Sequence, residues 1–231
     1  GSGTLTLSGG NSFTGGTTLT AGTLSLNSAS ALGSGTLTIN GGSLDNTSGS
    51  AITLSTNNAQ SWSADFAFAG TNNLNLGTGT VTLSAARQVT VSAGTLTVGG
   101  AFSGVYTLTK AGAGTLALGY QSTNGILAGD LTVNGGTLQI LSGAYLYNSS
   151  TYNTSRVVTV GTGGTLSLLT WAYGAAGGSG GLGAISAYSN QRILNGGTFE
   201  VTGGTQTSGC DFRVSSGSTG TFRYTPSGQT L

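Results

Sequence analysis

The 231-residue chain has no histidine, no methionine, one proline and one cysteine. Without histidine, Ser-His-Asp triads, Cys-His dyads and histidine-ligated metal sites are excluded. The single thiol, Cys210, makes neither an internal disulfide nor a zinc site, so we expect a small buried residue there, with an intermolecular disulfide or a reactive thiol as the alternatives. A chain without methionine is expected to be a processed product or a segment of a longer polypeptide.

Charge is also scarce, because charged residues make up 5 % of the chain against a usual ~25 %. The six basic residues are scattered and the net charge is +1, which leaves no basic patch for a nucleic-acid partner. No apolar run approaches ~18 residues, so no membrane-spanning helix is expected. The 44 glycines come with a single proline, a combination that excludes collagen and proline-rich linkers.

The chain does have one short pattern in abundance, in which an apolar residue alternates with a small polar one. This period of two is the signal of a β-strand. Glycine or Asn-Gly-Gly precedes most copies and supplies the positive φ that a sharp corner requires. The copies are "GTLTL" at 3–7, "GTLSL" at 22–26, "GTLTI" at 35–39, "GTVTL" at 79–83, "GTLTV" at 94–98, "GTLAL" at 114–118, "GTLQI" at 136–140, "GTLSL" at 164–168 and "GTFEV" at 197–201.

The spacing of the copies predicts how the strands are connected. Apolar pairs occur at Leu74/Leu76, Val81/Leu83, Val89/Val91 and Leu96/Val98, in steps of 7, 8 and 7 residues that sum to 22. Three short strands and three corners per 22 residues predict an all-β fold, a right-handed parallel β-helix that is a three-faced β-solenoid. An antiparallel sandwich is the alternative, but it favours two-residue hairpins and longer strands. The length predicts ~10 rungs and a rod of roughly 50 Å at ~4.8 Å per rung.

The pattern loosens in three segments. Residues 61–68 place Trp62, Ala64, Phe66 and Phe68 on one parity, which predicts a bulky part of the core. Residues 144–155 and 171–191 are interpreted as side loops or lateral extensions. No strong boundary divides the chain, so residues 1–231 are expected to form a single solenoid segment.

The chain offers little for catalysis or for metal binding. Its acids are Asp45, Asp65, Asp130, Glu200 and Asp211. Of these, only Asp45 and Asp65 are spaced to meet on adjacent rungs, and solitary outward or corner carboxylates are the favoured reading. "GGSLD" at 41–45 and "LAGDL" at 127–131 are weak calcium signals, and "KAGAGTL" at 110–116 is read as corner glycines rather than a phosphate loop. We therefore predict no catalytic residues, no metal site, no cofactor and no enzyme activity.

Two other groups of residues are singled out. Glu200 and Arg223 are 23 residues apart and share the outward parity, which predicts a structural ion pair between rungs, with the carboxylate and guanidinium within ~4 Å. The aromatic residues of the two side loops are the candidates for an assembly or recognition surface, against the simpler reading that they pack on the rod or close it. These are Tyr145, Tyr147, Tyr152, Trp171, Tyr173 and Tyr188.

Residues 1–46, which begin "GSGTLTLSGGNSFTGGTTLTAGTLSL", resemble the autotransporter-associated β-strand repeat, also called the passenger-associated transport repeat. A second segment, 108–140, is similar to the same repeat at its two ends, whereas its middle, "YQSTNGILAGD", departs from the repeat's Thr-Gly-Gly-Thr-Thr link. The resemblance implies an exported bacterial protein with a right-handed β-helix passenger. It brings no catalytic residues, because the family motif has none.

Composition and resemblance together lead to an expected function. We expect a non-catalytic structural protein, extracellular or on the bacterial cell surface, that forms a subunit or segment of a fibre. Its partner would be itself, by head-to-tail assembly or through further repeats of the same chain. The alternative is an adhesin stalk whose aromatic loops bind glycans or surfaces. A polysaccharide-cleaving β-helix is the least favoured reading, because histidine is absent and the carboxylates are dispersed.

Overall fold

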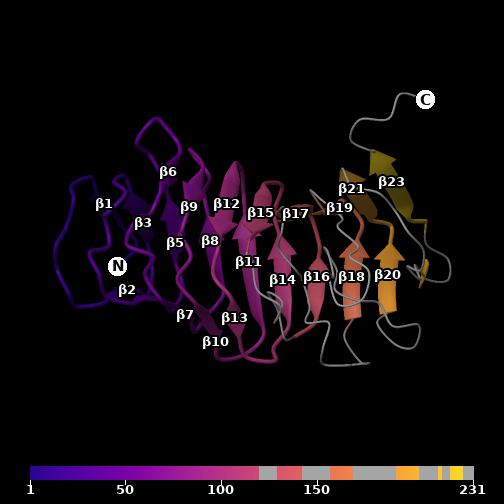
Figure 1. Cartoon of the computed structure of the whole chain (residues 1–231), viewed down its shortest axis with the longest axis horizontal. Coiled ribbons are helices and arrows are strands. Elements are labelled where there is room, and N and C mark those ends of the chain that lie inside the picture. Colours follow the sequence, from indigo (N-terminus) through magenta and orange to yellow (C-terminus); the bar gives the residue numbers. More distant parts are fainter. Residues whose placement is uncertain (120–128, 142–156, 169–190, 203–212, 215–218, 226–231) are drawn as a thin grey trace, which may run out of the picture.

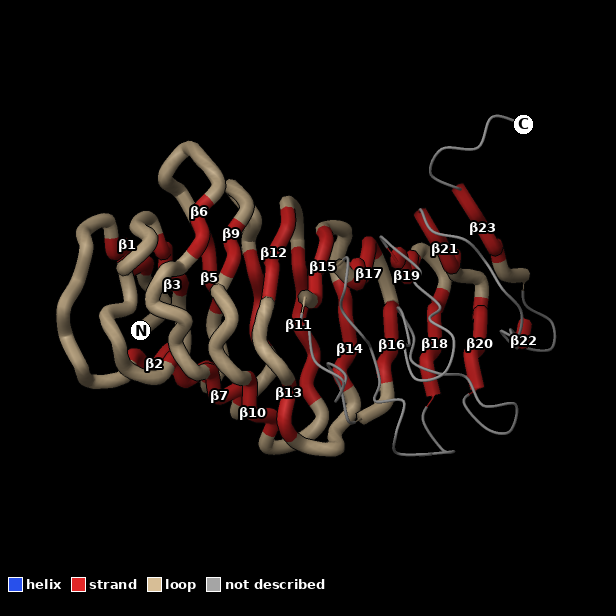
Figure 2. The backbone as a smooth tube through the Cα atoms, in the orientation of Figure 1, coloured by secondary structure: helices blue, strands red, loops and turns tan. Residues whose placement is uncertain are grey.

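The computed structural model describes residues 1–119, 129–141, 157–168, 191–202, 213–214 and 219–225. In these residues the chain is all-β, and it coils so that strands of successive turns pair in parallel (Figure 1). Figure 2 shows the result, an elongated stack of rungs whose strands run across the long axis. The predicted parallel β-solenoid is confirmed.

Three sheets run along the solenoid, and we name them sheets A, B and C. Sheet A has ten strands in the order of the chain. They are β1 (Thr4–Leu7), β3 (Thr23–Leu26), β5 (Ser43–Asp45), β8 (Phe66–Phe68), β11 (Arg87–Val91), β14 (Leu108–Ala111), β16 (Leu131–Val133), β18 (Val157–Gly161), β20 (Gln191–Asn195) and β22 (Arg213–Val214).

Sheets B and C are the other two faces. Sheet B has five strands and sheet C has eight. Sheet B contains β2 (Thr17–Leu19), β4 (Leu37–Ile39), β7 (Gln60–Trp62), β10 (Val81–Leu83) and β13 (Phe102–Ser103). Sheet C contains β6 (Ile52–Thr53), β9 (Leu74–Asn75), β12 (Thr95–Val98), β15 (Thr115–Leu118), β17 (Gly136–Ile140), β19 (Gly164–Leu168), β21 (Thr198–Thr202) and β23 (Thr221–Thr225).

The register confirms the rung length derived from the sequence. Leu96 in β12 lies opposite Leu74 in β9, 22 residues earlier. The step is not constant, since Thr23 lies opposite Thr4 after 19 residues and Gln191 lies opposite Val157 after 34. Parallel pairing places apolar residues above apolar residues at most inward positions, as at Leu74, Leu96 and Leu116 in sheet C, and this alignment stacks the core along the axis.

The first two rungs differ from the predicted three-faced plan. Residues 8–16 and 27–36 contain no strand, so sheet C begins only at β6. Residues 28–35 form turns and bends, and Ala31 and Leu32 there are fully buried. Two apolar side chains on a turn thus fill the part of the core where a strand of sheet C lies in later rungs.

The core is a continuous row of Leu, Ile, Val and Phe inside the three sheets. Trp62 is completely buried and packs edge-on against Phe66 at 4.9 Å and Phe102 at 5.2 Å between ring centroids. Phe68 is also completely buried, as the parity of residues 61–68 predicts, while Ala64 lies half-buried in the corner between β7 and β8. Edge-to-face aromatic contacts of this kind add to the energy of area burial.

Candidate functional site

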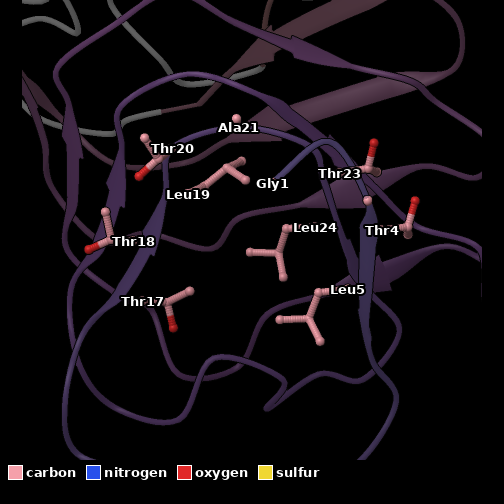
Figure 3. Close-up of a pocket in the computed structure, with 11 residues that line it drawn as sticks. Gly1, Thr4, Leu5, Thr17, Thr18, Leu19, Thr20, Ala21, Thr23 and Leu24 are labelled. Carbon is pink, nitrogen blue, oxygen red and sulfur yellow. The ribbon is translucent and has the colours of Figure 1, made fainter.

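A concavity of about 400 Å³ lies at the β1 end of the solenoid, between β1, β2 and β3. Figure 3 shows Leu5, Leu19 and Leu24 projecting toward its middle, whereas the hydroxyls of Thr4 and Thr18 point away. The alternation of each strand produces this separation, because successive side chains face opposite sides. Leu24 is 3 % exposed, since the first rung covers it, whereas Leu5 is 59 % exposed.

The same end carries backbone groups able to pair with another strand. β1 is the first strand of sheet A and pairs with β3, and β2 is the first strand of sheet B and pairs with β4. The opposite edge of such a strand presents N–H and C=O groups that accept a further parallel strand. The first rung therefore combines an apolar hollow with two strand edges.

Exposed apolar side chains gather at two places in the described part of the chain. Four large hydrophobic side chains are exposed there. Leu5 and Phe13 belong to the first rung, whereas Val105 and Tyr106 lie at the corner between β13 and β14. Leu5 lines the concavity, so the first rung is the best-developed candidate interaction surface.

A second unusual feature lies inside the rod, where Lys110 is fully buried in β14. Its ammonium nitrogen donates to the carbonyl oxygens of Ala111 and Gly112, both at 2.8 Å, and of Gly135, at 3.0 Å. Desolvation lowers the pKa of Lys110 from its usual 10.5 to about 8. The glycines of "KAGAGTL" form the expected corner, in which Gly112 has a φ of +80°.

The carboxylates lie apart from one another. Asp45, at the end of β5, is buried and accepts hydrogen bonds from the backbone N–H of Asn46 and from the N–H and hydroxyl of Thr71. Asp65 is exposed before β8 and accepts from the N–H of Gln88. Ser43 lies opposite Ala67, so Asp45 lies level with Ala69. Ala69 is four residues beyond Asp65, which separates the Asp45 and Asp65 positions by ~13 Å along the strand direction.

The remaining carboxylates have separate structural contacts. Asp130 accepts from the N–H of Val157 at 3.0 Å. Glu200 lies opposite Arg223 in sheet C, with 3.5 Å between Oε1 and Nη1, inside the expected limit. Within the described ranges, no cluster of three or more His, Cys, Asp or Glu residues is placed to hold a metal ion.

Several residues predicted from the sequence lie outside the described ranges. Cys210 and Asp211 are among them, and so are the side loop 144–155 and most of the loop 171–191, whose last residue, Gln191, begins β20. The six aromatic candidates are also outside, namely Tyr145, Tyr147, Tyr152, Trp171, Tyr173 and Tyr188. Their role remains a prediction.

Sequence reasoning missed both the internal lysine and the end concavity. Lys110 shares the parity of Leu108, which is the inward parity of its strand, so alternation alone was a usable signal. The concavity had no such signal, because it depends on how the first rung lies over the second. The described residues contain no helix, and therefore no helix that could cross a membrane.

Comparison with known proteins identifies two repeats in the chain. The sequence model of the passenger-associated-transport-repeat family matches residues 1–26 and 108–140. The first match ends at Leu26, earlier than the expected 46, and covers β1 to β3, whereas the second covers β14 to β17. No curated protein and no solved structure matches the chain. Repeats and fold fit an autotransporter passenger-like structural domain, and the chain is thus a β-solenoid that carries two passenger-associated transport repeats.

Proposed function

We propose that the chain is a non-catalytic structural segment of an extracellular fibre on the bacterial cell surface, in which a further parallel rung covers the first rung. The observation that carries this proposal is the apolar hollow between β1, β2 and β3 beside two strand edges. A rung with the same alternation supplies both inward apolar side chains and a parallel strand edge. The occupant to be tested is a second copy of the chain, joined end to end, and further repeats of the same chain are the alternative occupant.

Scarcity of charge supports this mode of assembly. The chain has six basic and five acidic residues, so little electrostatic repulsion opposes close axial contact between copies. An end-to-end contact uses two different surfaces, and a heterologous contact of this kind propagates into a filament unless it closes into a ring. Stacked rungs also gain stability from each neighbour interface.

The experiment compares two aspartate substitutions on the same strand. Leu5→Asp places a charge in the concavity, and Thr6→Asp places the same charge on an exposed neighbour in β1 that does not line it. We expect the unchanged chain and Thr6→Asp to form concentration-dependent filaments in sedimentation velocity and electron microscopy. Leu5→Asp should raise the concentration needed for assembly by at least about tenfold, which is the effect of ~1.4 kcal/mol per contact.

Two results would count against the proposal. If the unchanged chain stays a single rod at concentrations near 1 mM, copies do not cover the first rung. If Thr6→Asp impairs assembly as much as Leu5→Asp, the contact is not made through the concavity. Single rods standing on the cell surface would favour the adhesin alternative.

One observation favours that alternative, an adhesin stalk that binds glycans. Tyr106 is 41 % exposed beside Val105, which is 66 % exposed, at the corner between β13 and β14. A tyrosine ring exposed in this way stacks on the apolar face of a sugar. A glycan array probed with the unchanged chain and with Tyr106→Ala tests it, and binding that is insensitive to the substitution removes this corner as the site.

A further inference from the structure

Lys110 is a charged side chain with no exposed surface, although ordinary lysines almost always extend their ammonium into water. In sheet A it lies between Val89 of β11 and Val133 of β16, two positions that are also fully buried. A leucine or valine would continue this row. An ammonium in the row therefore needs a reason other than packing.

The contacts of the nitrogen supply that reason. An ammonium has three N–H donors, and all three meet backbone carbonyl oxygens at 2.8–3.0 Å. Ala111 is the last residue of β14 and Gly112 follows it in the corner, whereas Gly135 belongs to the corner after β16, in the next rung. One nitrogen thus joins the corners of two successive rungs.

The corner after β14 consists of Gly112, Ala113 and Gly114, which have no side-chain donor, whereas the corner after β16 consists of Asn134 and Gly135. Gly112 adopts a φ of +80° and Gly136 a φ of +58°, so the chain turns sharply at both. A carbonyl turned toward the interior in such a corner requires a donor, because an unpaired buried carbonyl costs about 1–3 kcal/mol.

We propose that the carbonyls of Ala111, Gly112 and Gly135 form an internal binding site for a primary amine, and that the chain occupies this site with its own Lys110. The bound amine fixes the register between the β14–β15 rung and the β16–β17 rung. Both rungs belong to the second matched repeat, residues 108–140, so the site ties the two halves of that repeat together.

Lys110→Ala deletes three carbon atoms and the amine, which together have the size of n-propylamine. Rescue of this variant by added n-propylamine therefore tests the site. We expect Lys110→Ala to lower the Tm of the full chain by about 4–10 °C. Refolding that variant in n-propylammonium chloride at pH 7 should restore at least half of the loss, whereas 1-propanol, which has the same length and no amine, should not. Val133→Ala is the matched control, since it opens a cavity in the same row and should gain nothing from the amine.

Two further measurements test the amine site even if Lys110→Ala fails to fold. Lys110→Met keeps the length of the side chain without the nitrogen, and a Tm equal to that of the unchanged chain would overturn the proposal. In the unchanged chain, ¹⁵N-edited NMR should show a Lys110 ammonium whose protons exchange at least about 100-fold more slowly than those of an exposed lysine. Exchange at the exposed rate, or equal rescue by 1-propanol, would also overturn it.

Discussion

Two corners between sheets A and C satisfy their backbone with side chains of opposite charge. In the early rungs, the carboxylate of Asp45 accepts from the N–H groups of Asn46 and Thr71. Farther along the rod, the nitrogen of Lys110 donates to carbonyl oxygens of Gly112 and Gly135. In each case the side chain contacts its own corner and the corner of the next rung.

The two corners differ in which backbone groups converge on the side chain, and these groups determine whether an acidic or a basic side chain stabilises the corner. Where N–H groups converge, an acceptor stabilises the turn, and where carbonyl groups converge, a donor is needed. Amide groups also satisfy corner carbonyls among the described residues. At the Asp45 corner, for example, Asn46 donates to the carbonyls of Ser50 and Asn73.

The largest effect expected from a single substitution is at a corner glycine. Gly136 has a φ of +58°, and a Cβ there would collide with the carbonyl oxygens of Gly112 and Gly114 in the Lys110 corner. Gly136→Ala should therefore lower the free energy of unfolding by about 4 kcal/mol or more, measured by urea denaturation.

Gly49→Ala is the matched control in the loop that follows Asp45. Gly49 has a φ of +88°, but a Cβ there would meet no atom within 4 Å. Only the left-handed backbone conformation opposes the substitution, which costs about 1–2 kcal/mol. Equal losses in the two variants would show that the carbonyl collision at Gly136 is relieved by a small shift of the backbone.

The second expected effect is a pH dependence specific to the Lys110 corner. The pKa of Lys110 is lowered to about 8 by desolvation, so this group loses its proton in the folded chain before it does in the unfolded chain, near 10.5. The unfolded state therefore binds more protons between these two values, and the free energy of unfolding rises with pH there. The full rise is about 3 kcal/mol, because one pKa unit corresponds to about 1.4 kcal/mol.

Lys110→Met isolates this contribution, since tyrosines and other groups titrate equally in both proteins. We expect the stability difference between the unchanged chain and Lys110→Met to widen from pH 7.5 to pH 10. The neutral amine still has two N–H donors, so two of the three carbonyl contacts survive deprotonation. A difference that is constant across this range would mean that the folded state does not lower the pKa of Lys110.

The third effect concerns the acidic corner. Asp45→Ala removes the acceptor for the buried N–H of Asn46 and the partly buried N–H of Thr71, and should lower the free energy of unfolding by about 2 kcal/mol. Asp65→Ala removes an exposed acceptor for the N–H of Gln88, and water replaces it at a cost below about 1 kcal/mol. Chemical denaturation of both variants measures the difference, and equal losses would mean that burial at the Asp45 corner adds nothing.

The regular part of this architecture could be predicted from the sequence because period and spacing act locally. The alternation at Leu74, Val81 and Val89 defines three faces, and the 22-residue step aligns Leu96 with Leu74. Bulky Trp62 and Phe68 share the inward parity and are buried. Each of these inferences needs only a strand's own pattern and the geometry of a parallel ladder.

The irregular features could not be predicted because they depend on contacts between rungs. Nothing local distinguishes residues 27–36, where Ala31 and Leu32 on a turn fill the core, from a corner of ordinary length. The parity of Lys110 indicates an inward side chain, but its third carbonyl partner comes from Gly135, 25 residues away. Likewise, the concavity arises only when the first rung is placed over the second.

The smallest effect is expected from the ion pair on the outer face of sheet C, which contrasts with both corners because water reaches it. Arg223 and Glu200 approach to 3.5 Å, but the arginine side chain is 61 % exposed and the glutamate side chain 23 %. A double-mutant cycle with Glu200→Gln and Arg223→Gln should give a coupling energy below about 1 kcal/mol. In 1 M salt the coupling should fall close to zero, because the Debye length shortens to about 3 Å. A coupling above about 2 kcal/mol that salt does not reduce would place this pair with the buried corners, as a contact shielded from solvent.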